Sequence, residues 1–268
     1  MAKKVSTYNS NPFTLSFTAL GRFFEHNAPW AVFLIAIALF GSFMRFAGNV
    51  LSSLAPHTSS AATTAEPNSV MLFVILGLLF IGVGIIGLAL VVAGYTYLSG
   101  MYSYVALQSL DGKKVGFNEA FQRTSKRFWP LLGAQALAFV KIIGWLCLFI
   151  VPGIVAAYRY ALLPYVVMAE EERKVRKIHD RTKVLVKKRL WEVFGIEFVA
   201  MLIPFAGGVV RYAGRAALFS QLKVARKDNQ DLPAVHWLNY IGFIVALCLF
   251  ALVAIGVLFI LLIHSLSA

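Results

Sequence analysis

The chain has 268 residues, of which 59% are hydrophobic and 14% are charged, and its mean hydropathy is +0.75. This composition excludes an ordinary soluble domain, in which about a quarter of the residues are charged. No charged residue lies between Pro67 and Leu110, whereas a helix needs only about 20 apolar residues to cross a bilayer core of about 30 Å. Transmembrane barrels are also excluded, because their strands alternate between apolar and polar residues. We therefore predict an all-α, polytopic transmembrane helix bundle with interfacial amphipathic helices, forming one membrane domain over residues 1–268.

The formal charge of +13 is the feature that favours a nucleic-acid partner, because Lys and Arg neutralise phosphates. Its distribution argues against one, since the basic residues cluster beside the apolar runs, as cytoplasmic loops and anionic-lipid contacts do. We expect no nucleic-acid binding, because no independently folded module surrounds the basic segments. Cys147 and Cys248 both lie within apolar runs, so they predict neither a disulfide framework nor a zinc site.

A helix is predicted to begin at Asn11-Pro12, with Asn as the cap and Pro at the first helical position, where no N–H is needed. An aromatic and aliphatic stripe follows at helical spacing: Phe13, Phe17, Leu20 and Phe24. This stripe predicts a helix that lies on the membrane surface or one that packs against other helices of the chain.

The apolar runs predict spans at residues 30–46, 70–98, 128–150, 154–169 and 235–266. Pro152-Gly153 is expected to form the turn between the third and fourth spans. Residues 194–221 are interrupted by Pro204, Gly207 and Gly208, so this segment is either a re-entrant helix pair or a single kinked span.

Residues 171–193 predict a basic amphipathic helix on the membrane surface, since their apolar positions share one arc of a helix. Its basic residues are candidate contacts for anionic lipid headgroups. They are Arg173, Lys174, Arg176, Lys177, Arg181, Lys183, Lys187, Lys188 and Arg189.

Lys and Arg alternate with segments that contain neither, and this pattern predicts the orientation of the chain. The N-terminus, residues 111–127 and the basic helix carry bases, whereas residues 47–69 and the Pro152-Gly153 turn carry none. The positive-inside rule therefore predicts a multi-pass protein of the cell membrane with a cytoplasmic N-terminus. A re-entrant pair at 194–221 keeps the bases of 211–233 inside and places the C-terminus outside.

Three charged residues inside apolar runs form the candidate polar site: Lys141, Arg159 and Glu197. Charged groups at membrane depth are costly, so they face protein or water. One interpretation is a polar cavity that holds an anionic headgroup or solute. The other is a structural ion pair, or side chains that extend to the interface near helix ends.

Several motifs carry a resemblance to a known family. Ser109-Leu110-Asp111-Gly112-Lys113-Lys114-Val115-Gly116-Phe117 precedes Phe128-Trp129, then Pro152-Gly153-Ile154, Arg159-Tyr160 and Leu190-Trp191-Glu192-Val193-Phe194-Gly195. Over residues 13–227 the chain resembles uncharacterised polytopic bacterial membrane proteins grouped with the membrane domain of glycerophosphodiester phosphodiesterases. The resemblance implies a membrane domain without known catalytic residues, and the soluble catalytic domain is absent. Thr182 stands where the family usually has Ser, and the part after Phe194 is shorter than expected.

No arrangement of residues typical of an active site is found in the sequence: the histidines are not at metal-ligand spacing, and no nucleophile elbow or phosphate-binding glycine loop occurs. We therefore expect a non-enzymatic membrane protein without cofactor or metal, acting as an envelope or lipid-associated scaffold. Expected partners are anionic headgroups on the cytoplasmic side, and a protein partner or a second copy. The alternative is a small transporter or channel with a polar cavity around Lys141, Arg159 and Glu197.

Overall fold

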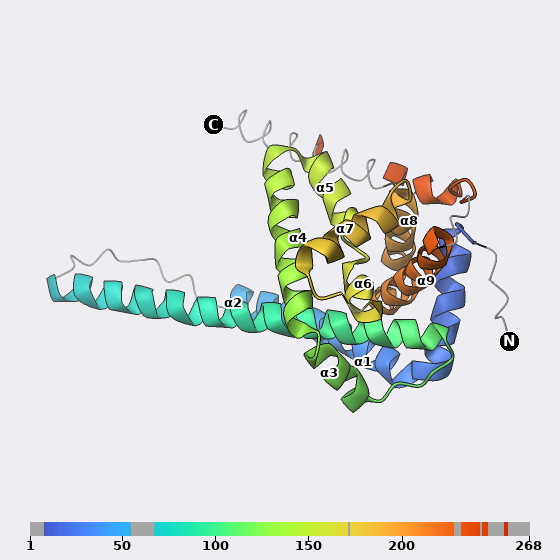
Figure 1. The fold of residues 1–268 in the computed structure, drawn as a ribbon. Coiled ribbons are helices and arrows are strands. Elements are labelled where there is room, and N and C mark those ends of the chain that lie inside the picture. The colour runs from blue at the N-terminus through green and yellow to red at the C-terminus, as the bar shows by residue number, and fades with distance from the viewer. Residues whose placement is uncertain are drawn as a thin grey trace.

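The computed structural model describes residues 8–54, 67–170, 172–227, 232–241, 243–245 and 255–256. Within these residues there are nine helices and no strand. A long hairpin of two helices projects from a body that the remaining helices form (Figure 1). The predicted all-α class is therefore confirmed.

The first helix, α1 (Pro12–Leu54), begins where the sequence predicts. The side-chain oxygen of Asn11 accepts hydrogen bonds from the backbone N–H groups of Phe13 (3.0 Å) and Thr14 (3.3 Å), so Asn11 caps the helix.

The predicted aromatic stripe of α1 is not its buried face. Phe17 and Phe24 are 47% and 37% exposed, whereas Leu15, Ala19 and Phe23 are buried. The buried residues also recur at helical spacing, and they pack in the main core of the body. Periodicity alone did not show which of the two stripes the other helices cover.

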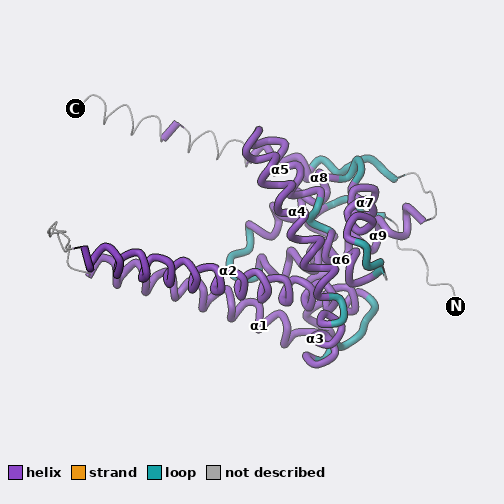
Figure 2. Tube along the Cα trace, turned by 60° about the vertical axis from the view of Figure 1, so that its left-hand side comes forward, coloured by secondary structure: helices purple, strands orange, loops and turns teal. Residues whose placement is uncertain are grey.

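The second helix, α2 (Pro67–Leu110), runs back along α1, and together they form the projecting hairpin (Figures 1 and 2). From Leu79 to Tyr95 most described side chains of α2 are exposed, and the first buried one is Thr96. The helix ends at a turn of Asp111 and Gly112, where Gly112 adopts a φ of +73° that favours glycine.

The body contains the first part of α1, the last turns of α2 and seven further helices. These seven are α3 (Phe117–Ser125), α4 (Phe128–Leu148), α5 (Ile150–Arg159), α6 (Leu163–Ala169), α7 (Val175–Val186), α8 (Leu190–Met201) and α9 (Gly207–Lys227). Helix α9 lies at the centre and packs against α1, α2, α7 and α8. Tyr102, Tyr165 and Phe219 are among the largest fully buried side chains, so aromatic residues from α2, α6 and α9 fill the core.

A kink in α1 joins the hairpin to the body. Pro29 has no N–H to donate to the preceding turn, and Asn27 leaves the helical conformation (φ −136°, ψ 38°). The amide group of Asn27 donates to Ser109 Oγ (2.8 Å) and to the carbonyl of Lys113 (2.9 Å), and it accepts from the N–H of Val115 (2.9 Å). Asn27 is 2% exposed, so the kink is clamped to the loop that follows α2.

The turn between α4 and α5 lies three residues before the predicted position. Helix α4 ends at Leu148, Phe149 is extended, and Pro152 lies in the first turn of α5, where its missing N–H is tolerated. Gly153 is required by close packing, because a Cβ there would lie 2.9 Å from the Cα of Leu146. The predicted fourth span divides into α5 and α6, and most of α6 is buried in the body.

The predicted basic helix of residues 171–193 is shorter than expected. Helix α7 ends at Val186, Lys188 takes a φ of 64°, and α8 starts at Leu190. Its apolar face is covered by other helices of the same chain, since Ile178 and Leu185 are fully buried and α7 contacts α4, α6 and α9. The expected contact of this apolar face with the membrane is therefore wrong.

Residues 194–221 belong to two helices, α8 and α9, that pack against each other. A single kinked helix is thus excluded, and the helix pair is confirmed, although its predicted re-entrant position remains a prediction. The predicted span 235–266 falls largely outside the described residues.

Four segments of the described chain are long and apolar enough to cross a membrane: Pro12–Val50, Leu79–Leu110, Phe128–Leu148 and Val151–Ala169. They differ in how far the protein itself covers them. In the most apolar 18-residue stretch of each segment, only 6% is buried inside the protein for the first and second segments, whereas 56% is buried for the fourth. The chain is a helical membrane protein, and the hairpin of α1 and α2 is its most fully exposed apolar part.

We predict that Asn27→Ala lowers the free energy of unfolding by about 2–3 kcal/mol, because the N–H of Val115 would be left buried without a partner. Thermal unfolding of purified protein in mild detergent measures this change. Asn118→Ala, at an exposed position of α3, is the matched control and should have little effect. Equal melting temperatures for Asn27→Ala and the wild type would contradict the role of the clamp.

Candidate functional site

Of the three charged residues of the predicted polar site, Glu197 is the one that forms ion pairs within the described chain. Glu197 of α8 pairs with two arginines of α9: Arg211 Nε lies 2.7 Å from Oε2, and Arg215 Nη2 lies 2.7 Å from Oε1. Among the described ion pairs, none joins Glu197 to Lys141 or Arg159. The antiparallel packing of α8 and α9 thus supplies the cations that neutralise Glu197, and the grouping of all three residues stays a prediction.

Sequence analysis missed Arg211 and Arg215 as partners, although a signal was present. They are four residues apart, so on a helix they lie on one face. The side chains of Glu197 and Arg215 are 14% and 20% exposed, and that of Arg211 is 46% exposed. This triad therefore stabilises the packing of α8 on α9, as the structural interpretation of Glu197 expected.

Lys141 lies on α4 and Arg159 at the end of α5, the two arms of one hairpin. The Nζ atom of Lys141 is 5.7 Å from the centre of the Tyr160 ring, and Tyr160 directly follows Arg159. Lys141 is also close enough to Lys183 and Arg176 of α7 to be affected by their charges. Arg159 is exposed at the end of α5. Both cations thus belong to the same side of the body as α7.

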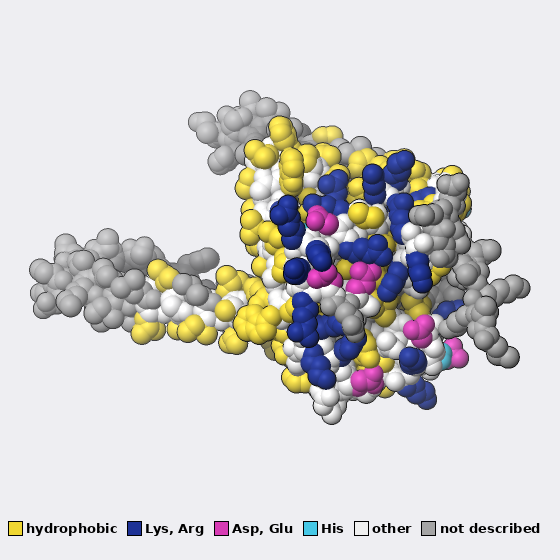
Figure 3. Space-filling view, in the orientation of Figure 1, with side chains coloured by type: hydrophobic (Ala, Val, Ile, Leu, Met, Phe, Trp, Pro, Cys, Tyr) yellow, Lys and Arg dark blue, Asp and Glu magenta, His cyan; other side chains and the backbone are white. Residues whose placement is uncertain are grey.

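The predicted lipid-contact residues fall into two groups. Lys177, Arg181, Lys183 and Arg189 form ion pairs with Glu172, Glu170, Asp180 and Glu192, respectively. The other five make no ion pair within the described chain and are exposed: Arg173, Lys174, Arg176, Lys187 and Lys188. Figure 3 shows Lys and Arg gathered over the body, next to the apolar side that faces the projecting hairpin.

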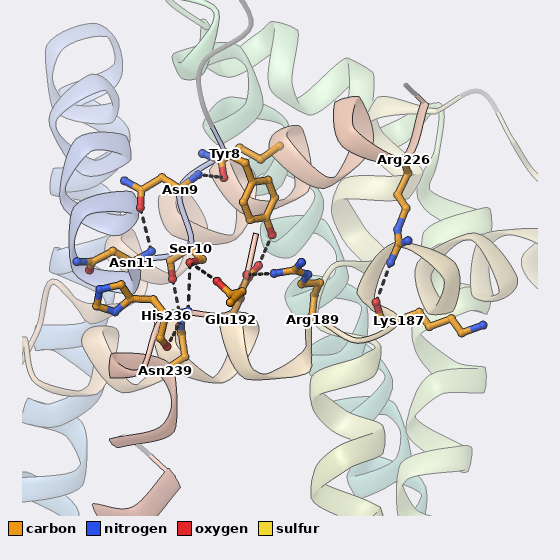
Figure 4. A network of polar contacts seen from close by, with 12 residues as sticks. Tyr8, Asn9, Ser10, Asn11, Lys187, Arg189, Glu192, Arg226, His236 and Asn239 are labelled. Atoms are coloured by element: carbon orange, nitrogen blue, oxygen red, sulfur yellow. Dashed lines mark hydrogen bonds and ion pairs between the residues drawn. The ribbon is translucent and has the colours of Figure 1, made fainter. Parts of the chain in front are cut away.

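Arg189 is not an accessible lipid contact. It is 7% exposed and pairs with Glu192, which is 2% exposed, at 3.0 Å. The hydroxyl of Tyr8 donates a further hydrogen bond to Glu192 (Figure 4). Burial raises the pKa of the Glu192 carboxyl, and the two donors compensate for part of this cost. The prediction that Arg189 contacts lipid is therefore wrong, because its charge is paired with Glu192 inside the body.

The same network attaches the residues before α1 to the segment after α9 (Figure 4). The amide of Asn239 donates to the carbonyl of Ser10 (2.7 Å), and the N–H of His236 donates to Ser10 Oγ (3.1 Å). Asn239 also packs closely on Gly195, where a Cβ would lie 2.0 Å from its side-chain oxygen. These contacts join both ends of the described chain to α8, so the network is structural.

His179 is buried, although Asp180 beside it is exposed. The residue is 1% exposed. Its Nε2 lies 2.9 Å from the carbonyl oxygen of Ala134, and the centre of its ring is 4.8 Å from the centre of the Tyr160 ring. The carbonyl only accepts, so Nε2 is the donor. Burial lowers the pKa of His179, so the ring stays neutral. Its hydrogen bond to Ala134 joins α7 to α4.

Two cavities in the described chain lie away from the predicted polar site. One, of about 690 Å³, borders the Asn27 kink, and the other, of about 550 Å³, lies between α2, α3 and α9. Neither is lined by Lys141, Arg159 or Glu197. Within the described residues, no group of three His, Cys, Asp or Glu side chains is placed to hold a metal ion.

Comparison of the chain with models of protein families, with curated proteins and with solved structures found no match.

The buried state of His179 predicts how stability depends on pH. An unfolded histidine takes up a proton near pH 6.5, whereas the buried ring does so only at lower pH. The free energy of unfolding should therefore fall as the pH decreases below about 6.5. In His179→Gln, which retains a donor but does not titrate, this part of the decrease should be absent. Melting temperatures between pH 5 and pH 8 test this, with His26→Gln as the control.

The triad predicts unequal costs for its members. Glu197→Gln should lower the free energy of unfolding by about 3 kcal/mol, because two arginines would lose their counter-charge and Arg215 is largely buried. Arg211→Gln should cost about 1 kcal/mol or less, since Arg211 is nearly half exposed and Arg215 still neutralises Glu197. Chemical or thermal unfolding in detergent compares the two variants. A larger loss in Arg211→Gln would contradict this assignment.

Proposed function

We propose that the protein is a non-enzymatic integral membrane protein of the cell membrane that holds anionic phospholipid headgroups at the cytoplasmic surface, as an envelope or lipid-associated scaffold. The observation that carries the proposal is the set of five exposed cations in and around α7 that have no acidic partner in the described chain. Each basic residue near an anionic surface contributes about 1 kcal/mol of attraction.

The neighbourhood of these cations supports a lipid partner over a soluble anion. Helix α7 lies against α4, and the end of α4 exposes large apolar side chains such as Trp145 and Leu148, at 49% and 66%. Cations beside an exposed apolar surface match the charge and polarity of a phospholipid, which has an anionic phosphate next to acyl chains. A soluble partner would leave this apolar surface in water.

The polar interior of the body supports a scaffold over a transporter. Glu197 is neutralised by Arg211 and Arg215, and the two described cavities lie elsewhere. Neither of these two cavities is lined by Lys141, Arg159 or Glu197, which favours the scaffold over the transporter alternative. The resemblance to the membrane domain of glycerophosphodiester phosphodiesterases remains part of the proposal, and it agrees with a role without catalysis.

We predict that Arg173→Gln/Arg176→Gln weakens binding of phosphatidylglycerol by about 30-fold, because two attractions of about 1 kcal/mol each are removed. Native mass spectrometry of the protein in mild detergent, titrated with phosphatidylglycerol or phosphatidylcholine, measures the change. Lys113→Gln/Lys114→Gln, an equal charge change at the exposed loop after α2, is the matched control and should retain most of the affinity.

Three results would contradict the proposal. One is equal weakening by the two double variants, which would indicate non-specific electrostatics. Another is chemical turnover of the bound lipid, which would indicate an enzyme. The third is an anion conductance in proteoliposomes that Lys141→Leu abolishes, which would favour the transporter alternative.

A further inference from the structure

We propose that the α4 and α5 hairpin enters only one leaflet of the bilayer and returns to the side of α7, although each arm is long enough in sequence to be taken for a span. The partner of this surface is a phospholipid leaflet: the acyl chains surround the end of the hairpin, and the phosphate groups meet the cations at its base. The inference rests on the membrane location within the proposed function, but not on a preference for anionic lipid.

Helix α7 shows how much of α4 must remain outside the hydrocarbon. The two helices run side by side, because Val175 packs near Gly133, His179 bonds to Ala134, and Lys183 lies near Lys141. The outer face of α7 carries exposed charged residues, including Arg176, Lys177 and Asp180.

A charged residue at the centre of a bilayer costs about 3 kcal/mol on insertion scales. Placing α7 at that depth would thus cost about 10 kcal/mol for its exposed charges. The stretch of α4 that lies beside α7, from Gly133 to Lys141, is therefore excluded from the membrane core.

The part of α4 beyond α7 is too short to cross. From Lys141 to Phe149 the helix extends by about 12 Å, less than half of the core thickness of about 30 Å. This end of the hairpin is apolar on all sides, and its exposed large residues are Ile143, Trp145, Leu146, Leu148, Phe149, Val151, Ile154 and Val155. Its length matches one leaflet.

Lys141 on the outgoing arm and Arg159 on the returning arm lie at the base of this apolar end. The Nζ atom of Lys141 lies 5.7 Å from the centre of the ring of Tyr160, the residue that follows Arg159, so the two arms meet at this level. Long basic side chains at such a boundary extend to the phosphate layer. The two cations that the sequence places inside apolar runs thus mark where the hairpin enters the leaflet.

The long hairpin gives an independent reason. The hydrogen bonds and ring contacts between α2 and α4 in the described chain fall within Thr96–Ser99 on α2 and Phe128–Gln135 on α4. The helices therefore cross at one place, and both views show α4 running crosswise to α2 (Figures 1 and 2). Beyond this crossing, α2 has about 43 Å of helix back to Pro67, enough to span. With α2 along the membrane normal, α4 is steeply inclined to that normal, so its apolar end enters the leaflet obliquely and does not cross.

Cys147, exposed near the end of α4, is a natural probe of this inference. In Cys248→Ala, Cys147 is the sole cysteine, and a membrane-impermeant maleimide is applied from each side of oriented proteoliposomes. We expect labelling from neither side, at a rate about tenfold below that in detergent, because a membrane-impermeant reagent does not reach a thiol surrounded by acyl chains. A bimane group attached to Cys147 before reconstitution should be quenched by lipids brominated on their acyl chains.

Two reporter cysteines in a Cys147→Ala/Cys248→Ala background calibrate the sides. Lys177→Cys should react from the α7 side, and Ser53→Cys, at the far end of α1, from the opposite side. Labelling of Cys147 from the Ser53 side would show that the hairpin crosses, and labelling from the Lys177 side would show that its end is in water. Either result overturns the inference. The lipid titration above is read separately, so one proposal can fail while the other holds.

Discussion

The placement of this protein depends on one solvent constraint: the charged outer face of α7 requires water, while the apolar end of the α4 and α5 hairpin requires hydrocarbon. The two lie within a few helical turns of each other, because α7 packs along α4 as far as Lys141. Their boundary must coincide with the phosphate layer. The exposed cations, the proposed lipid contacts and the depth of the hairpin all follow from that one boundary.

Two carboxylates of α8 are paired inside the body. Glu197 lies between Arg211 and Arg215, and Glu192 lies between Arg189 and Tyr8. Buried pairs of this kind contribute little net stability compared with apolar contacts, but they cost several kcal/mol when one partner is lost. They therefore specify how α8 packs against α9 and against the N-terminal residues.

The clamp at Asn27 gives the molecule its overall arrangement. It directs the first part of α1 along the body and the second part along α2, so one helix serves both the core and the membrane hairpin. The distribution of polar residues on α2 agrees with this division: Thr96 and Ser99 bond to Gln135 of α4, and the exposed stretch before them is apolar. The proposed scaffold role uses this fixed connection between the hairpin and the lipid-facing surface.

Features that depend on neighbouring residues in the chain were predictable from sequence. The Asn11 cap and the Asp111-Gly112 turn are local, because a side chain or a φ preference decides them within a few residues. Pro204 and Gly207 interrupt a continuous helix, so the sequence predicted either a helix pair or a kinked span at residues 194–221. The pair of α8 and α9 was one of these two alternatives. The Pro152-Gly153 turn was displaced, because Pro is tolerated in the first turn of α5 as well as at the end of α4.

By itself, the sequence determined that the chain is helical, that it belongs in a membrane, and where its bases cluster, because length, hydropathy and local capping are properties of contiguous residues. Only the tertiary structure decided what covers each face. The apolar face of α7 is suited equally to lipid and to protein, and it is buried against α4, α6 and α9. Glu197 of α8 pairs with Arg211 and Arg215 of α9, and Lys141 lies beside α7. A side chain has many chemically equivalent partners available for a long-range contact. The packing of whole helices decides which of them it meets.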